Sequence, residues 1–272
     1  MQKSNFHTHT IFSDGHDTVR EMIDTALEKG FHTIGFSDHS PLRHENDWTM
    51  TPKNAVDNYN VVRNAAEEYR GRIKVFCGLE LDRETEECDY ADIDYYYIIS
   101  SVHHIVRGGK VLAIDLSADE QRKIVSELCG SSCIEFAKMY FHDLTEHVCR
   151  NKTDIVGHFD LLTKYSLIPE ESDEYISCAV SAIGEIIKYS NTFELNTGAI
   201  ARGLRTVPYP AGFILDEIKR LGGRVIITSD CHYRHKLDYW FNEAESFLQC
   251  HGFIKNENAF LNERVGGIEI WS

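Results

Sequence analysis

Histidines and acidic residues recur in short clusters along the chain, each where a strand is predicted to end. Nine of them are candidate metal ligands: His7, His9, Asp14, His39, Glu80, His104, His158, Asp230 and His232. Imidazole and carboxylate groups suit zinc, manganese and iron. Nine protein ligands exceed the coordination shell of one ion, but with one bridging carboxylate they could hold two or three ions and leave positions for water. This pattern indicates a metallohydrolase.

The spacing inside the clusters supports a shared site. His7 and His9 are separated by one residue, as are the acid and the histidine of the later motif SDCH. Alternate residues of an extended segment point to the same side. Glu80 follows the apolar run 75–79. A carboxylate that enters from a buried strand is costly unless it is paired or bound to metal, so its position also favours a ligand.

The remaining histidines have simpler interpretations. His103 neighbours His104 but is expected to point to the opposite face of the strand, since successive side chains alternate. His16 is an alternative to Asp14 as the ligand from the first loop. Four others are expected to face solvent or to bond locally: His32, His142, His147 and His251.

Strands and helices are predicted to alternate along the chain. The strands cover residues 4–6, 33–36, 74–79, 95–101, 154–156, 192–195 and 224–228, and 267–271 is a further candidate strand. The helices cover 18–29, 53–69, 118–150 with an interruption near Gly130, 173–189, 211–221 and 236–251. Such alternation predicts a parallel sheet with right-handed crossovers.

The position of the candidate ligands decides between two kinds of parallel sheet. Polar groups follow nearly every strand, as in a barrel, whereas open sheets gather their ligands at one switch point. Seven strands favour a seven-unit, TIM-like (β/α)7 barrel with the active site at the C-terminal ends of the strands. At 272 residues the chain can form one such domain, so we expect residues 1–272 to be a single unit.

Composition and charge exclude several classes of function. The net charge of −15 argues against a broad nucleic-acid surface, although bound divalent ions could still attract a small anion. No apolar run reaches the roughly 18 residues of a membrane span, and the N-terminus has no apolar signal segment. We therefore expect a cytoplasmic protein without a membrane partner. The eight cysteines are scattered and are expected to be reduced.

In this order the clusters resemble the PHP (polymerase and histidinol phosphatase) superfamily. The motifs that carry the likeness are HTH, SDG, SDH, GLE, a histidine after a middle strand, GHFD and SDCH, from His7 to His232. Within the superfamily, the runs FSDGHDTVREMIDTALEKGFHTIGFSDHSPL and VGHFDLLTKY, with ELNT and a later YP, are most similar to monofunctional bacterial histidinol-phosphate phosphatases.

The resemblance implies a distorted (β/α)7 barrel with a trinuclear centre of zinc, iron or manganese. The ligands would divide into His7, His9, Glu80 and Asp230 at one ion, His104 and His158 with bridging Glu80 at the second, and Asp14, His39 and His232 at the third. Several relatives have a histidine in place of Asp14.

The implied reaction is hydrolysis of L-histidinol phosphate to L-histidinol and phosphate, a step of histidine biosynthesis. Metals lower the pKa of bound water toward about 7, so a hydroxide bridging two metals would attack phosphorus in line. By the resemblance, Glu80 and Asp230 would belong to this catalytic centre. The leaving alkoxide needs a proton, and His44 or a metal-bound water is the candidate donor. The alternative substrate is another small phosphate ester or a nucleotide.

Four cations follow predicted strands on the active-site face and are candidates for substrate binding: Arg43, Lys164, Arg202 and Arg205. Arginine can bind phosphate with two parallel donors, so Arg202 and Arg205 are the preferred phosphate-binding candidates. The alternative interpretation is that they belong to a basic loop exposed to solvent. Two other functions are disfavoured. A non-catalytic PHP module of a polymerase should not retain the full ligand set, and a structural zinc site is usually a closed single-ion cluster.

Overall fold

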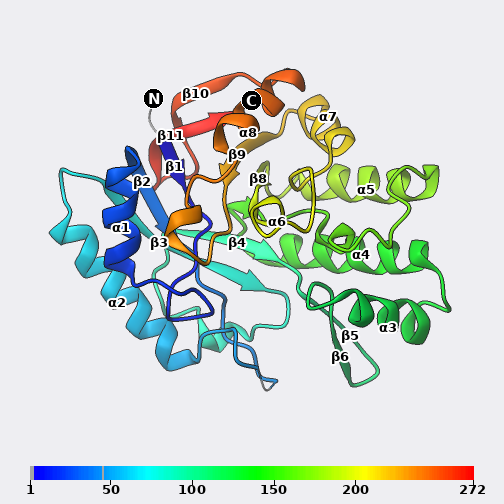
Figure 1. Cartoon of the computed structure of the whole chain (residues 1–272). Helices are drawn as coiled ribbons and strands as arrows, with labels where there is room; N and C mark the ends of the chain where they lie inside the picture. The colour runs from blue at the N-terminus through cyan, green and yellow to red at the C-terminus, as the bar shows by residue number, and fades with distance from the viewer. Residues whose placement is uncertain (1–2, 45) are drawn as a thin grey trace.

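Seven parallel strands form the centre of the fold (Figure 1). The computed structural model describes residues 3–44 and 46–272. The strands are β1 (Lys3–Asn5), β2 (Phe31–Phe36), β3 (Lys74–Asp82), β4 (Tyr97–Ser101), β7 (Ile155–Val156), β8 (Thr192–Asn196) and β9 (Arg224–Thr228). They lie in that order, and the sheet continues through β11 (Gly266–Trp271) to β10 (Lys255–Phe260). These last two strands run antiparallel to their neighbours.

The sheet curls until its first and last parallel strands approach each other. The segments that follow β1 and β9 form a parallel bridge between Thr8 and Cys231, and the backbone N–H of His9 donates to the carbonyl of Cys231 at 3.0 Å. At the N-terminal end, β11 pairs with β9 through Trp271 and Val225 and contacts β1. The prediction of a distorted TIM-like barrel is therefore confirmed.

The helices connect the strands and cover the outside of the sheet (Figure 1). They are α1 (Val19–Glu28), α2 (Pro52–Glu68), α3 (Ala118–Leu128), α4 (Cys133–Arg150), α5 (Asp173–Ile186), α6 (Gly198–Ala201), α7 (Gly212–Arg220) and α8 (Phe241–Cys250). Short 3₁₀ turns are η1 (Glu87–Asp89), η2 (Leu161–Thr163) and η3 (Arg234–Lys236). Hydroxyl caps begin several helices. Thr18 forms a capping box with Glu21 at α1, which satisfies N–H groups that the helix leaves free.

Several parts of the chain differ from the sequence prediction, among them β10 and α6, which were not predicted. The segment after β4 forms a hairpin of β5 (His104–Arg107) and β6 (Lys110–Ala113), which turns at Gly108 and Gly109 with positive φ at both. The last helix begins at Phe241 rather than Lys236, because Trp240 adopts a left-handed backbone with φ of 65°. By contrast, the predicted interruption near Gly130 is confirmed: Gly130 and Ser131 have φ of 56° and 65° and separate α3 from α4.

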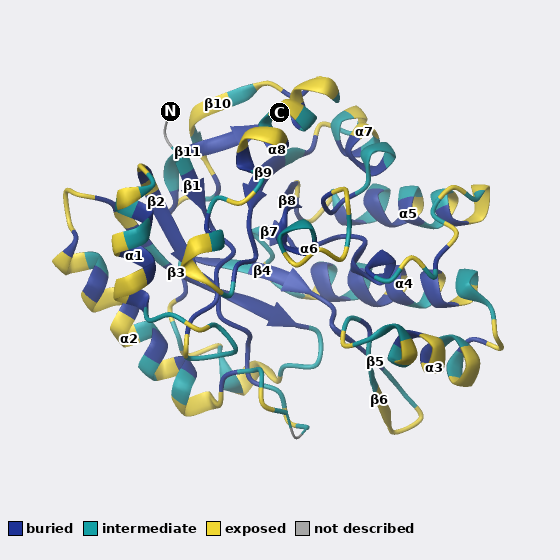
Figure 2. Ribbon diagram, viewed as in Figure 1, coloured by how far each residue is buried: buried dark blue, intermediate teal, exposed yellow. Residues whose placement is uncertain are grey.

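The central strands are mostly buried (Figure 2), and side chains from β4, β7, β9 and β11, with Phe6 after β1, form one apolar core cluster. Tyr97 lies at its centre and donates a hydrogen bond to the carbonyl of Phe6 at 2.6 Å. Its ring occupies the space beside Gly78, where an added Cβ would lie 2.3 Å from the ring. This packing leaves the C-terminal ends of the strands as the open face of the barrel. No helix in residues 3–44 and 46–272 is both long and apolar enough to cross a membrane.

Candidate metal centre

Polar residues at the C-terminal ends of the strands converge on one buried site. Three groups have ligand atoms that all lie within 4.8 Å of one another: His9, Asp14, His39 and His232; His7, His9 and Asp230; and His39, Glu80 and His103. The groups share members, so they form one continuous cluster. Eight of the nine sequence candidates take part in it or, like His158, adjoin it through Glu80.

Glu80 lies at the centre of this cluster with its side chain fully buried. Five imidazole nitrogens surround its carboxylate, at 2.7 Å for His39 Nδ1, 3.0 Å for His158 Nε2, 3.3 Å for His7 Nε2, 3.4 Å for His103 Nε2 and 3.7 Å for His9 Nε2. Oε1 faces His103 and His158, while Oε2 faces the other three rings. The two oxygens therefore face two different sets of histidines.

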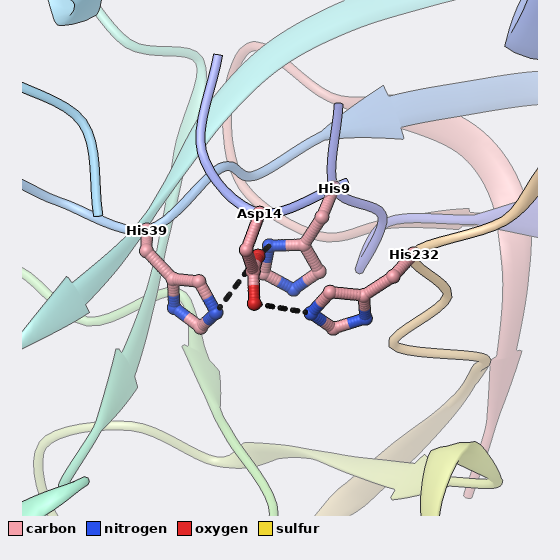
Figure 3. Close-up of side chains that lie close together, drawn as sticks. All are labelled: His9, Asp14, His39 and His232. Atoms are coloured by element: carbon pink, nitrogen blue, oxygen red, sulfur yellow. Dashed lines mark ion pairs between the residues drawn. The ribbon is translucent and has the colours of Figure 1, made fainter. Parts of the chain in front are cut away.

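Asp14 occupies the outer part of the cluster, between His39 and His232 (Figure 3). Its carboxylate lies 3.1 Å from His232 Nε2 and 3.6 Å from His39 Nε2. The alternative from the same loop, His16, is exposed and stacks on Tyr233 with ring centroids 4.1 Å apart. The loop thus presents Asp14 to the cluster and His16 to the surface.

The expected orientation of the two consecutive histidines after β4 is wrong. His103 enters the cluster, and its Nδ1 lies 2.9 Å from Asp82 Oδ2. His104 instead packs against Trp48 and His44, with ring centroids at 5.5 and 4.7 Å. Strand alternation fails here because β4 ends at Ser101 and a separate hairpin begins at His104.

The cluster fits divalent metal ions. Within residues 3–44 and 46–272, its buried atoms without a hydrogen-bond partner include His7 Nε2, both ring nitrogens of His9 and Asp14 Oδ1. Such atoms are costly unless something binds them.

Burial, with His39 and His232 nearby, lowers the pKa of His9 to about 3, so its ring is neutral and can donate a lone pair. Burial opposes a charge on His7 as well, yet Glu194, Glu80 and Asp230 hold the pKa of His7 well above its ordinary value. The carboxylates therefore favour a cation at this position.

Comparison with known proteins agrees with this site. Residues 5–198 match the PHP domain. This chain belongs to the PHP domain family. The histidinol-phosphatase of Bacillus subtilis is 27% identical over 270 residues, covering 92% of this chain and 99% of the relative. The histidinol-phosphatase of Saccharomyces cerevisiae is 22% identical over 301 residues, covering 91% and 88%.

Two solved structures share the fold of this PHP domain. The hisK protein of Listeria monocytogenes superimposes with a TM-score of 0.78 at 20% identity, over 89% of this chain and 99% of that chain. Histidinol phosphate phosphatase (HISK) from Lactococcus lactis, crystallised with zinc, L-histidinol and phosphate, has a TM-score of 0.69 at 19% identity, over 93% and 95%. These likenesses establish the distorted barrel.

In the PHP site, Asp230 is held in an unusual backbone conformation with φ of 46°. A left-handed backbone at a non-glycine residue is strained and often marks a functional position. Arg202 bonds to Asp230 twice, from Nη2 to Oδ2 at 3.0 Å and from Nη1 to the carbonyl at 3.2 Å. Burial opposes the charge of Asp230, but Arg202 and His7 keep its pKa well below its ordinary value. Asp230 thus remains an anion that faces the cluster.

A cavity of about 1090 Å³ opens above the buried histidine–carboxylate cluster. His44, Lys164 and Arg202 line it, and Lys164 Nζ is held by Asp115 Oδ2 at 3.0 Å. The hairpin supplies Val111 and Ala113 to the wall.

The other two predicted substrate cations lie elsewhere in the described part of the chain. Arg43 is bound at the surface to Asp89, with Nη2 2.8 Å from Oδ1. Arg205 is bound to Glu170 through two contacts of 3.2 and 3.1 Å and to the Thr163 carbonyl. Neither contributes to the cavity lining, so their placement does not support a substrate role.

Several residues of the site were not predicted from the sequence. They are His103, the buried carboxylates Asp82 and Glu194, and the cavity residues Trp48, His235 and Lys236. A polar residue inside a buried strand was a usable signal for Glu194, as it was for Glu80. No comparable signal identified Lys236, since basic residues are common in surface turns.

Proposed function

We propose that this PHP protein is a metal-dependent phosphomonoesterase that hydrolyses L-histidinol phosphate to L-histidinol and phosphate in histidine biosynthesis. The observation that carries the proposal is the buried histidine–carboxylate cluster beneath an open cavity. The names of the Bacillus subtilis and Saccharomyces cerevisiae relatives support this choice of substrate, as do the ligands of the Lactococcus lactis structure.

The proposed ligand set contains eight of the predicted residues, with His103 in place of His104: His7, His9, Asp14, His39, Glu80, His103, His158, Asp230 and His232. Two or three divalent ions bound here would polarise the phosphoryl oxygens and lower the pKa of water toward about 7. Glu80 is the proposed bridge, because each of its oxygens faces a different set of histidines. His7, His9 and Asp230 form the inner group, and Asp14, His39 and His232 the outer one.

The cavity residues suggest how the substrate would be oriented. Arg202 presents a guanidinium beside Asp230 at the border of cluster and cavity, where it can bind non-bridging phosphate oxygens. Lys164 and Lys236 line other parts of the cavity and can add positive charge. His44 also lines the cavity, and its buried Nε2 has no hydrogen-bond partner among the residues that the structure describes. It is the proposed donor of the proton that the leaving alkoxide needs.

The test is phosphate release from a panel of phosphomonoesters by the metal-loaded enzyme. The panel contains L-histidinol phosphate, other alkyl phosphates and nucleoside monophosphates, with chelator-treated enzyme as the control. We expect the highest kcat/KM with L-histidinol phosphate and loss of activity after chelation. A higher kcat/KM with another ester or a nucleotide would support the alternative phosphoesterase function. Release that is unaffected by chelation would refute the metal-dependent reaction.

A further inference from the structure

Glu194 lies in β8 behind the metal centre, with its side chain fully buried. Its carboxylate accepts four hydrogen bonds. Oε2 accepts from His7 Nδ1 and from Thr228 Oγ1, both at 2.8 Å. Oε1 accepts from the backbone N–H of His158 at 2.5 Å and from Asn196 Nδ2 at 2.9 Å. One carboxylate thus contacts two proposed metal ligands that follow different strands.

The two groups at Oε1 can act only as donors. A backbone N–H such as that of His158 has no other role. Asn196 is fixed by its second contact, because its Oδ1 accepts from the backbone N–H of Gly198 at 2.8 Å. Its Nδ2 therefore faces Glu194. At Oε2, by contrast, the imidazole of His7 can change tautomer and the hydroxyl of Thr228 can rotate.

The contact with His7 has a consequence for metal binding. A proton held on Nδ1 by Glu194 leaves the lone pair on Nε2, which lies 3.3 Å from Glu80 Oε2 and 3.8 Å from Asp230 Oδ1. Hydrogen bonds of this kind fix the tautomer and the ring orientation of metal-ligating histidines. We infer that Glu194 is a positioning residue that sets the metal-binding tautomer of His7 and, through the His158 N–H, locates the second ligand. This rests on the proposed ligand roles of His7 and His158.

The substitution Glu194→Gln tests this with almost no change of shape. An amide has one acceptor oxygen and one donor NH₂ group, so its oxygen must face the permanent donors of His158 and Asn196. Its NH₂ then faces His7 Nδ1 and forces the ring proton onto Nε2, where it blocks a metal. Removal of a hydrogen bond that orients a metal-ligating histidine weakens metal affinity by about 10- to 100-fold. We expect such a loss for zinc, measured by competition with a chelator.

The control is Thr228→Val, which removes the hydroxyl at Oε2 but leaves the carboxylate to accept from His7. We expect zinc affinity close to wild type. Equal zinc affinity in Glu194→Gln and wild type would overturn the inference, as would equal losses in both variants. Wild-type protein that binds no zinc would instead refute the proposed metal centre. The two failures are therefore distinguishable.

A second measurement determines the tautomer in the wild-type protein itself. Nitrogen-15 NMR of zinc-loaded wild-type protein, with His7 assigned by a His7→Gln variant, reports which ring nitrogen carries the proton. Protonated Nδ1 and unprotonated, metal-shifted Nε2 support the inference. The opposite tautomer overturns it.

Discussion

Glu80→Gln would remove the charge of the central carboxylate while it retains the shape of the side chain. Glu80 is within 3.7 Å of five imidazole nitrogens, and its side chain is fully buried. Burial opposes ionisation, but His7, His39 and His103 hold the pKa of Glu80 well below its ordinary value. The native side chain is therefore an anion. The amide would carry no charge to offset divalent ions, and its NH₂ would face rings whose lone pairs must stay free.

The size of the effect follows from the position of this carboxylate between two sets of histidines. Both oxygens of Glu80 face proposed ligands, so one substitution disturbs two parts of the centre. We expect loss of at least about one ion per chain, because the bridging ligand is gone. We also expect kcat to fall by at least about a thousandfold, which corresponds to roughly 4 kcal/mol of transition-state stabilisation.

Three assays separate the causes. Circular dichroism follows the fold, elemental analysis the metal content, and phosphate release the rate. Glu269→Gln is a matched control, since Glu269 is another buried glutamate but lies on β11, away from the cluster, and pairs with Lys255. A folded Glu80→Gln protein with near-normal turnover would remove Glu80 from the mechanism and refute the bridging role.

Four further predictions concern metal content, phosphate binding and stability. Purified protein freed of loose metal should hold about two to three ions per chain by elemental analysis, because nine proposed ligands exceed the coordination shell of one ion. A reproducible value of one ion or fewer would contradict the proposed multinuclear centre. Arg202→Ala should lower kcat/KM by roughly thirty- to a hundredfold, about 2–3 kcal/mol, because it removes a charge-assisted donor beside Asp230. Arg205→Ala, which removes hydrogen bonds to Glu170 and Thr163, should lower the melting temperature and leave KM near normal. If steady-state kinetics instead show a loss of kcat/KM in Arg205→Ala and none in Arg202→Ala, Arg205 rather than Arg202 binds the phosphate. Gly78→Ala should destabilise the fold by about 1–3 kcal/mol in denaturant titration, because the new methyl group would lie 2.3 Å from the ring of Tyr97; unchanged stability would show that this ring moves freely.

The strands and most members of the buried histidine–carboxylate cluster could be predicted because their signals are local. An apolar run followed by a polar residue marks the end of each buried strand, and residues 224–228 were predicted with the bounds of β9. The same local reasoning failed at His103, because alternation holds only while a strand continues and β4 ends at Ser101.

Pairing between distant residues could not be predicted in the same way. Arg205 is engaged by Glu170, and Glu194 reaches His7 from the other half of the chain. Nothing in the sequence around Arg205 or Glu194 identifies these partners. The choice among several basic residues for a substrate role depends on such pairings, so it required the three-dimensional structure.

The bridge between Thr8 and Cys231 closes the barrel where the two ends of its parallel sheet meet. The residues beside it, His7 and His9 on one side and Asp230 and His232 on the other, belong to the proposed metal centre. Ions bound there would cross-link segments separated by nearly the whole chain, and would do so only in the folded state. Their binding energy would add to the folding free energy by about 4 kcal/mol at a free concentration a thousand times the Kd. The proposed catalytic centre would then also be a reversible cross-link, and the concentration of free metal would affect the fraction of the protein that is folded.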